Sequence, residues 1–350
     1  MTLSRRSFAL AALAVPALAS CSGGEDPAAS SGGAAAGGGA AEGSFPATVT
    51  HLYGETVVEA EPTRIVTVSW VNGDSVLALG VVPVGLPVVT WGGNDNGSTD
   101  WIDAKLEELG AGWDSENAPT QYDETDGLNL DEMAALTPDL IVAAYSGITE
   151  EEYEQLSKIA PTIGPIAANY TTSWQEAVTA IGTATGRGED AEALISGIEG
   201  DLAAVGEENP AIAESTFIAG NLGLADNSIA FYVGEDTRPR FFTAIGMTQA
   251  EVVAENSSAA ENFYVEWSAE RADELDSDIF YTWAEAGTTV EDYQANGLFA
   301  QIPAVAAGGV VLTDDDHLTL SISAASALSL PWAIENFVPS VIEVADSVAG

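Results

Sequence analysis

The feature that most constrains this chain is an internal repeat. Segments 129–161 and 268–303 carry similar residues in the same order, 139 positions apart at first and 140 apart after one inserted residue. Each copy has a capped helix, a strand that begins with Asp, a glycine turn and an acidic helix that contains Tyr. The paired positions are Leu136 with Leu275, Asp139 with Asp278, Gly147 with Gly287, Tyr153 with Tyr293, and Ile159 with Phe299. Such a repeat predicts two similar α/β lobes.

Short apolar runs rich in β-branched residues predict buried strands at 64–70, 81–85 and 139–145. Because helical segments separate these runs, we expect a mainly parallel sheet with helices on both faces of each lobe. Asn72 and Asp74 are expected to cap the helix that follows the first strand.

A long amphipathic helix is expected between the two lobes. Its apolar residues recur at helical spacing and would form one face: Ala191, Leu194, Ile195, Ile198, Leu202 and Val205. About 20 residues at 1.5 Å each would reach about 30 Å, enough to join two lobes. We therefore expect an N-terminal lobe over 45–185, a connecting helix over 186–209, and a C-terminal lobe over 210–350 that closes with one helix from Pro331 to about Val348.

The first 44 residues are typical of an export signal followed by a tether. Residues 1–20 place Arg5 and Arg6 before a short apolar run, which resembles a twin-arginine signal, and they end in a sequence similar to a bacterial lipobox. The lipobox places lipidation at Cys21, the only cysteine of the chain. Residues 21–44 are rich in Gly, Ala and Ser, a composition typical of a flexible linker. We expect an extracytoplasmic protein anchored to the cell membrane through Cys21.

Charge and composition exclude several classes of function. Nine Lys and Arg against 54 Asp and Glu give a net charge of −45, which disfavours nucleic-acid binding. One cysteine and two histidines are too few for a thiolate cluster or a typical zinc site, so we expect no protein-bound metal. His51 is expected at the surface. His317 follows three aspartates, which could hold a cation but are more typical of a solvated turn.

Several segments resemble the iron–siderophore substrate-binding lipoproteins of ABC importers, the helical-backbone class of periplasmic binding proteins, in their high-GC Gram-positive form. The similarity spans about residues 45–345, and its clearest segments are 62–68, 74–85, 136–142, 145–161, 173–176 and 298–304. The resemblance implies two Rossmann-like lobes joined by one long helix, a ligand cleft between them, an ABC permease as partner and no catalysis. It implies no resident cofactor, because the siderophore itself supplies the oxygen ligands of Fe(III).

Candidate ligand residues lie where strands end, because open parallel sheets bind ligands at the carboxyl ends of their strands. Four aromatic residues occupy such places: Trp70, Trp91, Tyr145 and Trp283. Each could instead be a packing residue, as we expect for Trp101, Trp113, Trp174 and Trp332. Arg238 and Arg240 flank Pro239, and the resemblance implies that arginines in this region contact negatively charged ligand oxygens. The alternative is ion pairing with Glu235 and Asp236.

The expected function is capture of a ferric siderophore and its delivery to an importer, by a monomer. The resemblance also implies that one exposed glutamate per lobe docks the permease, and Glu132 and Glu270 are the candidates. The same fold could instead bind cobalamin or haem, and an iron-ligating Tyr145 would indicate haem. A hydrolase is disfavoured, because the chain has no G-x-S-x-G motif and no histidine placed as a base for a serine.

Overall fold

A five-stranded parallel sheet forms the centre of lobe 1 in the computed structural model, which describes residues 41, 43–168, 170–257 and 262–350. Its strands, in the order β5-β4-β3-β6-β7, are β5 (Thr120–Tyr122), β4 (Gly85–Pro87), β3 (Ile65–Thr67), β6 (Leu140–Val142) and β7 (Thr162–Ile163). Its helices are α1 (Asn72–Ala78), α2 (Asp100–Glu108), α3 (Leu130–Ala135), α4 (Glu150–Leu156) and α5 (Trp174–Ala184). A hairpin of β1 (Ala47–His51) and β2 (Gly54–Val58) precedes the sheet.

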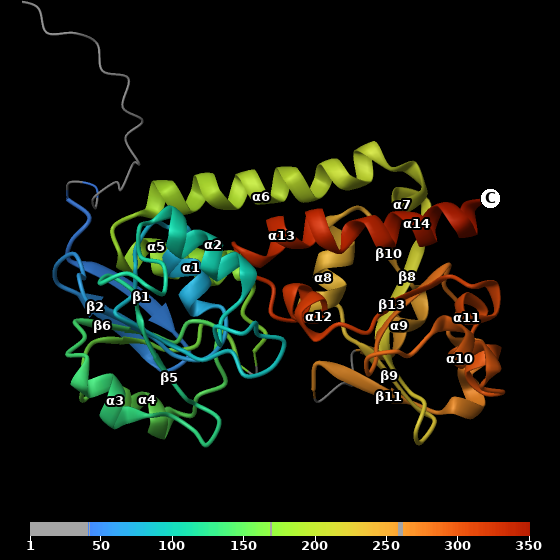
Figure 1. Ribbon diagram of the computed structural model, residues 1–350, viewed down its shortest axis with the longest axis horizontal. Helices are drawn as coiled ribbons and strands as arrows, with labels where there is room; N and C mark the ends of the chain where they lie inside the picture. The colour runs from blue at the N-terminus through green and yellow to red at the C-terminus, as the bar shows by residue number, and fades with distance from the viewer. Residues whose placement is uncertain (1–40, 42, 169, 258–261) are drawn as a thin grey trace, which may run out of the picture. The chain divides into compact units, whose positions relative to one another are not determined.

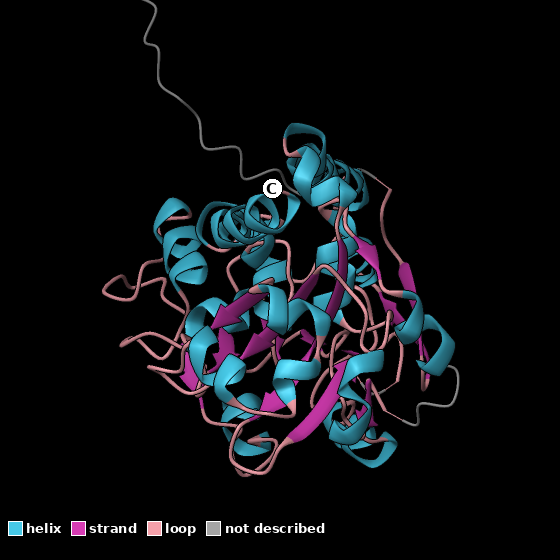
Figure 2. Ribbon diagram, turned by 90° about the vertical axis from the view of Figure 1, so that its right-hand side faces the viewer, coloured by secondary structure: helices cyan, strands magenta, loops and turns pink. Residues whose placement is uncertain are grey.

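Helices cover both faces of this sheet, as expected. Consecutive strand residues point to opposite faces, and they belong to different apolar clusters. Ile65 and Leu140 join the cluster that contains α5, whereas Val66 and Ile141 pack with residues of α3 and α4. Figure 2, seen from the side of lobe 2, shows how helices and strands are arranged around each other in the molecule.

Lobe 2 contains a mixed six-stranded sheet in place of a purely parallel one. The strands are β8 (Thr216–Gly223), β9 (Ser228–Tyr232), β10 (Thr248–Gln249), β11 (Tyr264–Trp267), β12 (Ile279–Trp283) and β13 (Val310–Thr313), in the order β11-β9-β8-β12-β13 with β10 beside β8. The surrounding helices are α8 (Thr237–Ala244), α9 (Glu251–Ser257), η1 (Ala269–Glu274), α10 (Val290–Ala295), η2 (Phe299–Gln301) and α11 (Pro303–Ala307). The β8–β9 hairpin and the β9–β11 pair are antiparallel, whereas β8 runs parallel to β12 and to β10.

The internal repeat of the sequence corresponds to a repeated structural device. Asp139 precedes β6 and accepts a hydrogen bond from the backbone N–H of Thr63 at 2.8 Å, just before β3. Asp278 precedes β12 and accepts one from the backbone N–H of Thr216 at 2.8 Å, at the start of β8. Each aspartate thus joins the two central parallel strands of its lobe. A threonine capping box also starts the next helix in both copies, α4 and α10.

The long helix α6 (Gly188–Glu208) runs over both lobes, as Figure 1 shows. Its expected apolar face is correct, since Ala191, Ile198, Leu202 and Val205 are buried and Leu194 and Ile195 are partly buried. At 21 residues it is about 31 Å long. The short α7 (Pro210–Glu214) then leads into β8. The predicted fold class, two α/β lobes joined by one long helix, is confirmed.

The single closing helix that we expected is divided in two. Helix α13 (Ser329–Asn336) ends before Phe337, and α14 (Val338–Ala349) begins after it. Pro339 explains the break, because it has no N–H to donate to the carbonyl of Glu335 and its ring would clash there. Phe337 at the joint is fully buried in the core.

The chain returns to lobe 1 before it ends. Helix α12 (Asp316–Ser323) and the segment after it share an apolar cluster with α1 and α2 that contains Leu77, Trp101 and Leu320. At its edge Asp74 of α1 accepts hydrogen bonds from Nε1 of Trp101 at 2.8 Å and from Oγ of Ser326 at 2.6 Å. The buried Asp74 side chain therefore links α1 to the C-terminal segment by a hydrogen bond and does not cap α1. Across the described ranges, no helix combines the length and apolarity needed to cross a membrane.

Candidate functional site

Two of the predicted ligand residues, Trp70 and Tyr145, are held together by one buried asparagine. Trp70 follows β3 and Tyr145 follows β6, at the carboxyl ends of neighbouring parallel strands. Asn72 is fully buried and exchanges two hydrogen bonds with the backbone of Tyr145, donating to its carbonyl at 2.9 Å and accepting from its N–H at 3.0 Å. Nδ2 of Asn72 also donates to the carbonyl oxygens of Val68 at 2.6 Å and Trp70 at 3.2 Å. The expected capping role of Asn72 is thus replaced by this link.

The backbone on each side of Trp70 is left-handed. Ser69 has φ of 64° and Val71 has φ of 53°, a conformation that is costly for a β-branched residue and clusters at functional sites. Glu124 fixes the turn, because Oε2 of its carboxyl group accepts a hydrogen bond from the N–H of Ser69 at 2.9 Å. Burial raises the pKa of Glu124 to about 7. The turn presents the Trp70 ring half-exposed, at 50% of its surface.

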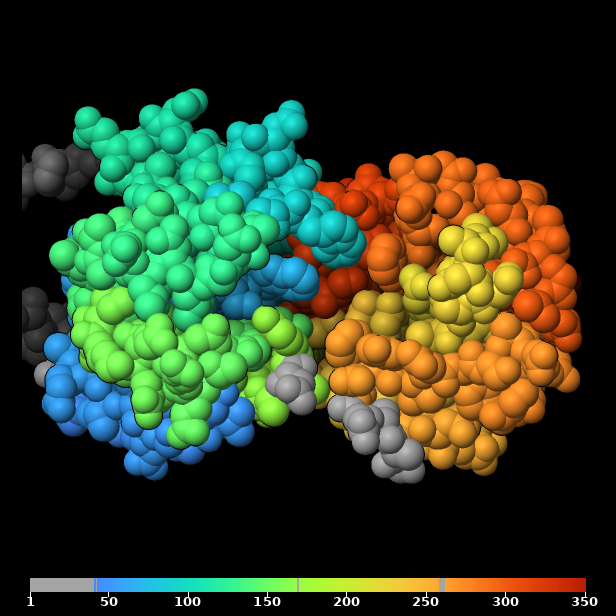
Figure 3. Space-filling view, turned by 90° about the horizontal axis from the view of Figure 1, so that it is seen from below, coloured from blue at the N-terminus to red at the C-terminus, as the bar shows by residue number. Residues whose placement is uncertain are grey.

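A cavity of about 270 Å³ opens between the lobes at this place, and we call it the cleft cavity. Its lining comes from both lobes: Trp70, Tyr145, Tyr170, Thr171, Asp236, Arg238, Phe263 and Ser323. Five large apolar side chains are exposed in the described parts of the chain, and three of them, Trp70, Tyr170 and Phe263, line this cavity. Figure 3 shows the hollow between the two halves of the molecule. An exposed aromatic lining of this kind is typical of a ligand site.

Arg238 enters the cleft cavity as half of an ion pair. Its Nε donates to Oδ1 of Asp236 at 2.7 Å and its Nη2 donates to Oδ2 at 2.8 Å, a bidentate geometry. The guanidinium group also stacks on the ring of Tyr232, with its central carbon 3.4 Å from the ring centroid. Asp236 is itself the N-cap of α8. Arg238 therefore forms the ion pair with Asp236 that we gave as the alternative to ligand binding, and both residues of this pair line the cavity.

Arg240 faces a different cavity from Arg238. Its Nη1 donates to the carbonyl oxygen of Thr171 at 3.3 Å, and its side chain lines a space of about 820 Å³ between α5, α6 and α8. Glu176 and Glu199 line the same space. The two arginines are close in sequence, but the structure does not bring them together in the cleft cavity.

Trp91 and Trp283 meet at the other end of the inter-lobe region. Their ring centroids are 6.2 Å apart in an edge-to-face arrangement, one ring from each lobe. Both line a cavity of about 650 Å³ that also includes Glu285, Asp314, Asp315, Asp316 and His317. Nε1 of Trp283 donates to the hydroxyl of Tyr232 at 3.0 Å, the same tyrosine on which Arg238 stacks. All four aromatic candidates therefore lie along the inter-lobe region.

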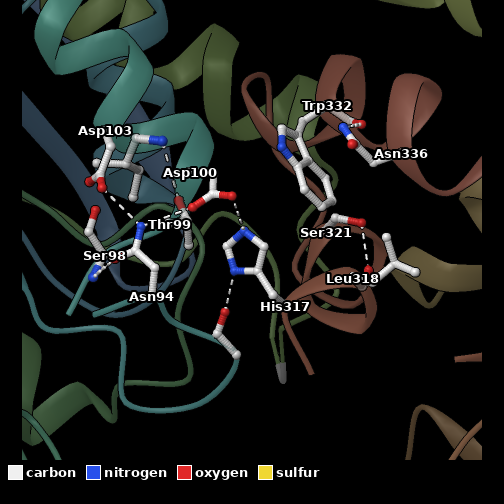
Figure 4. A network of polar contacts seen from close by, with 12 residues as sticks. Asn94, Ser98, Thr99, Asp100, Asp103, His317, Leu318, Ser321, Trp332 and Asn336 are labelled. Atoms are coloured by element: carbon white, nitrogen blue, oxygen red, sulfur yellow. Dashed lines mark hydrogen bonds and ion pairs between the residues drawn. The ribbon is translucent and has the colours of Figure 1, made fainter. Parts of the chain in front are cut away.

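His51 is buried and His317 is partly buried. His51, which we expected at the surface, is buried in β1, where its Nε2 lies 2.9 Å from Oγ1 of Thr56. The ring of His317 packs against the rings of Trp101 and Trp332, and its Nδ1 donates to the carbonyl oxygen of Gly92 at 2.6 Å. Figure 4 shows His317 beside Trp332 and Asp100. Its Nε2 is 3.6 Å from Oδ2 of Asp100. Among the described residues no group of three His, Cys, Asp or Glu side chains could hold a metal ion.

The remaining sequence candidates lie away from the cleft cavity. Glu132 in α3 and Glu270 in η1 are both exposed, one on each lobe. Cys21 lies outside the described residues. Trp101 and Trp174 are buried, as expected for packing residues.

Sequence reasoning missed two aromatic residues of the cleft cavity, Tyr170 and Phe263. Both lie outside the sheet ends, Tyr170 in a loop before α5 and Phe263 just before β11, where no periodicity marks them. The hydrogen bonds of Asn72 to the backbone could have been suspected from the sequence. Asn72 lies two positions after Trp70 at the end of a strand, where backbone N–H and C=O groups need hydrogen-bond partners.

A family model described as periplasmic binding protein matches residues 65–317. The Fe(3+)-citrate-binding protein YfmC of Bacillus subtilis is 27% identical over 268 residues, which cover 76% of this chain and 78% of that protein. The putative ABC transporter substrate-binding lipoprotein YhfQ of the same organism is 29% identical over 176 residues, 49% of this chain and 50% of that protein. The crystal structure of Streptococcus pneumoniae PiaA in complex with ferrichrome aligns with a TM-score of 0.78 at 30% identity, covering 86% of this chain and 99% of that one.

Proposed function

Because this chain belongs to the periplasmic binding protein family, we propose that it captures a ferric siderophore in the cleft cavity and delivers it to an ABC importer. The family is one of binding proteins, so the chain is not an enzyme. Two of the similar proteins are described with iron complexes, the Fe(3+)-citrate-binding protein of Bacillus subtilis and PiaA in complex with ferrichrome.

The observation that carries this proposal is the lining of the cleft cavity. Trp70, Tyr170 and Phe263 offer exposed apolar rings from both lobes, and Arg238 offers N–H donors beside them. A ferric siderophore has a matching surface, with an apolar body and a rim of oxygen atoms around the metal. Because a ligand would contact both lobes, its binding would also change how far apart the lobes lie. An importer could thereby distinguish the ligand-bound protein from the free protein.

The test is quenching of tryptophan fluorescence by a panel of iron-loaded siderophores, haem and cobalamin. Trp70 lines the cavity and is half-exposed, so a bound ferric chelate is expected to quench it in a saturable way. Trp70→Phe should lose most of this quenching, whereas Trp332→Phe, away from the cavity, should keep it. Iron-free siderophores serve as the chemical control. The proposal fails if no ferric siderophore binds, or if only haem or cobalamin does.

Haem is the less favoured ligand because of the environment of Tyr145. Burial first, and then the nearby carboxylate of Asp236, raise the pKa of the Tyr145 phenol. A tyrosine that ligates haem iron does so as a phenolate, and this environment opposes that form. Haem binding through Tyr145 would appear as an absorption spectrum that Tyr145→Phe abolishes.

We further propose that Glu132 and Glu270 dock the permease. Each is exposed near the start of the helix that precedes the Asp-led strand of its lobe, so the internal repeat relates their positions. Arginines on the permease subunits would be their partners.

We also propose that lipidation of Cys21 anchors the protein on the outer side of the cell membrane. The lipobox-like sequence before Cys21 supports this, as does the description of the similar protein YhfQ as a lipoprotein. Two or more acyl chains hold a protein stably at a bilayer, where one gives only marginal binding.

A further inference from the structure

The cleft cavity carries no net charge. Of its lining residues only Asp236 and Arg238 are charged, and they neutralise each other through the two hydrogen bonds of their bidentate pair. The pair is well shielded, with 9% of the Asp236 side chain and 12% of the Arg238 side chain exposed. The other lining side chains are aromatic or hydroxyl groups. A ligand here therefore meets directed hydrogen-bond donors and apolar rings, without an excess positive charge.

Arg240 lies next to the cleft cavity without lining it, because its Nη1 donates to the carbonyl oxygen of Thr171, a lining residue, while its side chain lines a different cavity. In that other cavity Glu176 and Glu199 accompany it. Desolvation raises the pKa of Glu176, but hydrogen bonds from Ser173 and, to a smaller extent, the charge of Arg240 lower the pKa below its ordinary value.

The opposite end of the inter-lobe region is acidic. Around Trp91 and Trp283 lie four carboxylates, those of Glu285, Asp314, Asp315 and Asp316. A small apolar space of about 40 Å³ is lined by both Trp70 and Trp91 and thus adjoins both ends. A ligand that extends from the cleft cavity toward Trp91 would move into the negative potential of these carboxylates.

We infer that the site selects a ferric chelate with a net charge of zero or above, of the tris-hydroxamate class, and discriminates against anionic catecholate and carboxylate chelates. This inference rests on the proposed function. Three hydroxamate groups carry one negative charge each and neutralise Fe(III), whereas three catecholate groups carry two each and leave a net charge of −3. Arg238 then donates hydrogen bonds to the polarised chelate oxygens, and Asp236 determines specificity by cancelling its charge.

This refines our expectation that the arginines attract an anionic ligand. An unpaired buried guanidinium group would favour anions. Asp236 removes that preference because its carboxylate neutralises the guanidinium charge. The carboxylate also orients the group by accepting hydrogen bonds from two of its five N–H donors, and the other three are available to a ligand.

The experiment uses one iron chelate whose charge is varied. Ferrioxamine B carries a free ammonium group and a net charge of +1, its acetylated form carries 0, and its succinylated form carries −1. A neutral cyclic tris-hydroxamate and a ferric tris-catecholate of charge −3 complete the panel, and calorimetry on the wild-type chain gives each dissociation constant. We expect the uncharged or cationic hydroxamates to bind at least tenfold more tightly than the succinylated form, and the tris-catecholate to bind more weakly still.

Asp236→Asn tests the role assigned to the ion pair. It should reduce the ratio between the dissociation constants of the succinylated and acetylated chelates by about tenfold, because the positive charge of Arg238 would no longer be neutralised by a carboxylate. Glu235→Gln is the matched control, because it removes the same charge from a neighbouring residue that is exposed and does not line the cavity. This variant should leave the ratio of the two dissociation constants unchanged. If Asp236→Asn fails to fold, the wild-type series decides.

The possible outcomes separate the two proposals. Equal or tighter binding of the succinylated form, or tightest binding of the tris-catecholate, overturns the selectivity while the siderophore function stands. Absence of binding by every ferric chelate in the panel overturns both.

Discussion

Replacement of Asn72 by alanine should destabilise lobe 1 and weaken ligand binding together. Asn72 makes three short hydrogen bonds to backbone groups of Val68 and Tyr145, at 2.6, 2.9 and 3.0 Å, in a fully buried site. A buried hydrogen bond contributes about 1 kcal/mol, and each backbone group left without a partner costs at least that much. We therefore expect Asn72→Ala to lower the free energy of unfolding by about 3 kcal/mol, out of a typical total of about 5–15 kcal/mol.

The measurement is equilibrium unfolding in urea, followed by circular dichroism. With a denaturant slope of about 3 kcal/mol per molar, the loss corresponds to a shift of about 1 M in the transition midpoint. Asn336→Ala is the matched control, because Asn336 is exposed and makes one side-chain hydrogen bond, to the carbonyl oxygen of Trp332 at 2.8 Å. The control should change the free energy of unfolding by less than about 0.5 kcal/mol.

The second readout is affinity at a temperature where the variant is folded. Because Asn72 fixes the backbone of Tyr145 and contacts the carbonyl of Trp70, ligand binding should weaken by about tenfold. The reasoning is refuted if Asn72→Ala matches Asn336→Ala in midpoint, or if it is destabilised with affinity unchanged.

Three further predictions concern pH, anchoring and transport. Burial raises the pKa of Glu124 from 4.5 to about 7, so the folded state favours the protonated form, and stability should fall as the pH rises from about 4.5 to 7 and then level off. Glu124→Gln should flatten that dependence in thermal melts, and a curve parallel to wild type would exclude Glu124 as its source. Cys21→Ala should leave the membrane fraction for the medium or remain unprocessed, and tight attachment of this variant would rule out Cys21 as the anchor. Glu132→Ala combined with Glu270→Ala should leave siderophore affinity and melting temperature unchanged while uptake by cells falls sharply. Wild-type uptake by this double variant would place the docking residues elsewhere.

The sequence was informative where the chemistry is local or periodic. The strands that begin with Asp could be found because Asp139 and Asp278 have the same role in each lobe. Each carboxylate accepts a hydrogen bond from the backbone N–H of a threonine at or just before the start of the neighbouring strand. The apolar face of α6 followed from spacing alone. Trp70 and Tyr145 could be located because parallel strands end at one edge of a sheet.

The parts that could not be predicted depend on packing between distant segments. Tyr170 and Phe263 reach the cleft cavity from loops in different lobes, so no local pattern marks them. The separation of Arg238 from Arg240 depends on the direction of each side chain along α8, which is set by partners such as Asp236 and Thr171. The antiparallel β8–β9 hairpin was also missed, although Asp226 and Asn227 at its turn are typical turn residues.

The return of the chain to lobe 1 has a consequence for biogenesis. The surface of α1 and α2 that contains Leu77 and Trp101 is covered by α12 and the segment after it, more than 200 residues further along the chain. A ribosome that has finished lobe 1 has not yet made its cover, so this apolar surface stays in water until α12 and the segment after it have been synthesised. Contacts between such distant residues slow folding and leave incomplete chains prone to aggregation. Lobe 1 can therefore complete its native packing only after α12 has left the ribosome.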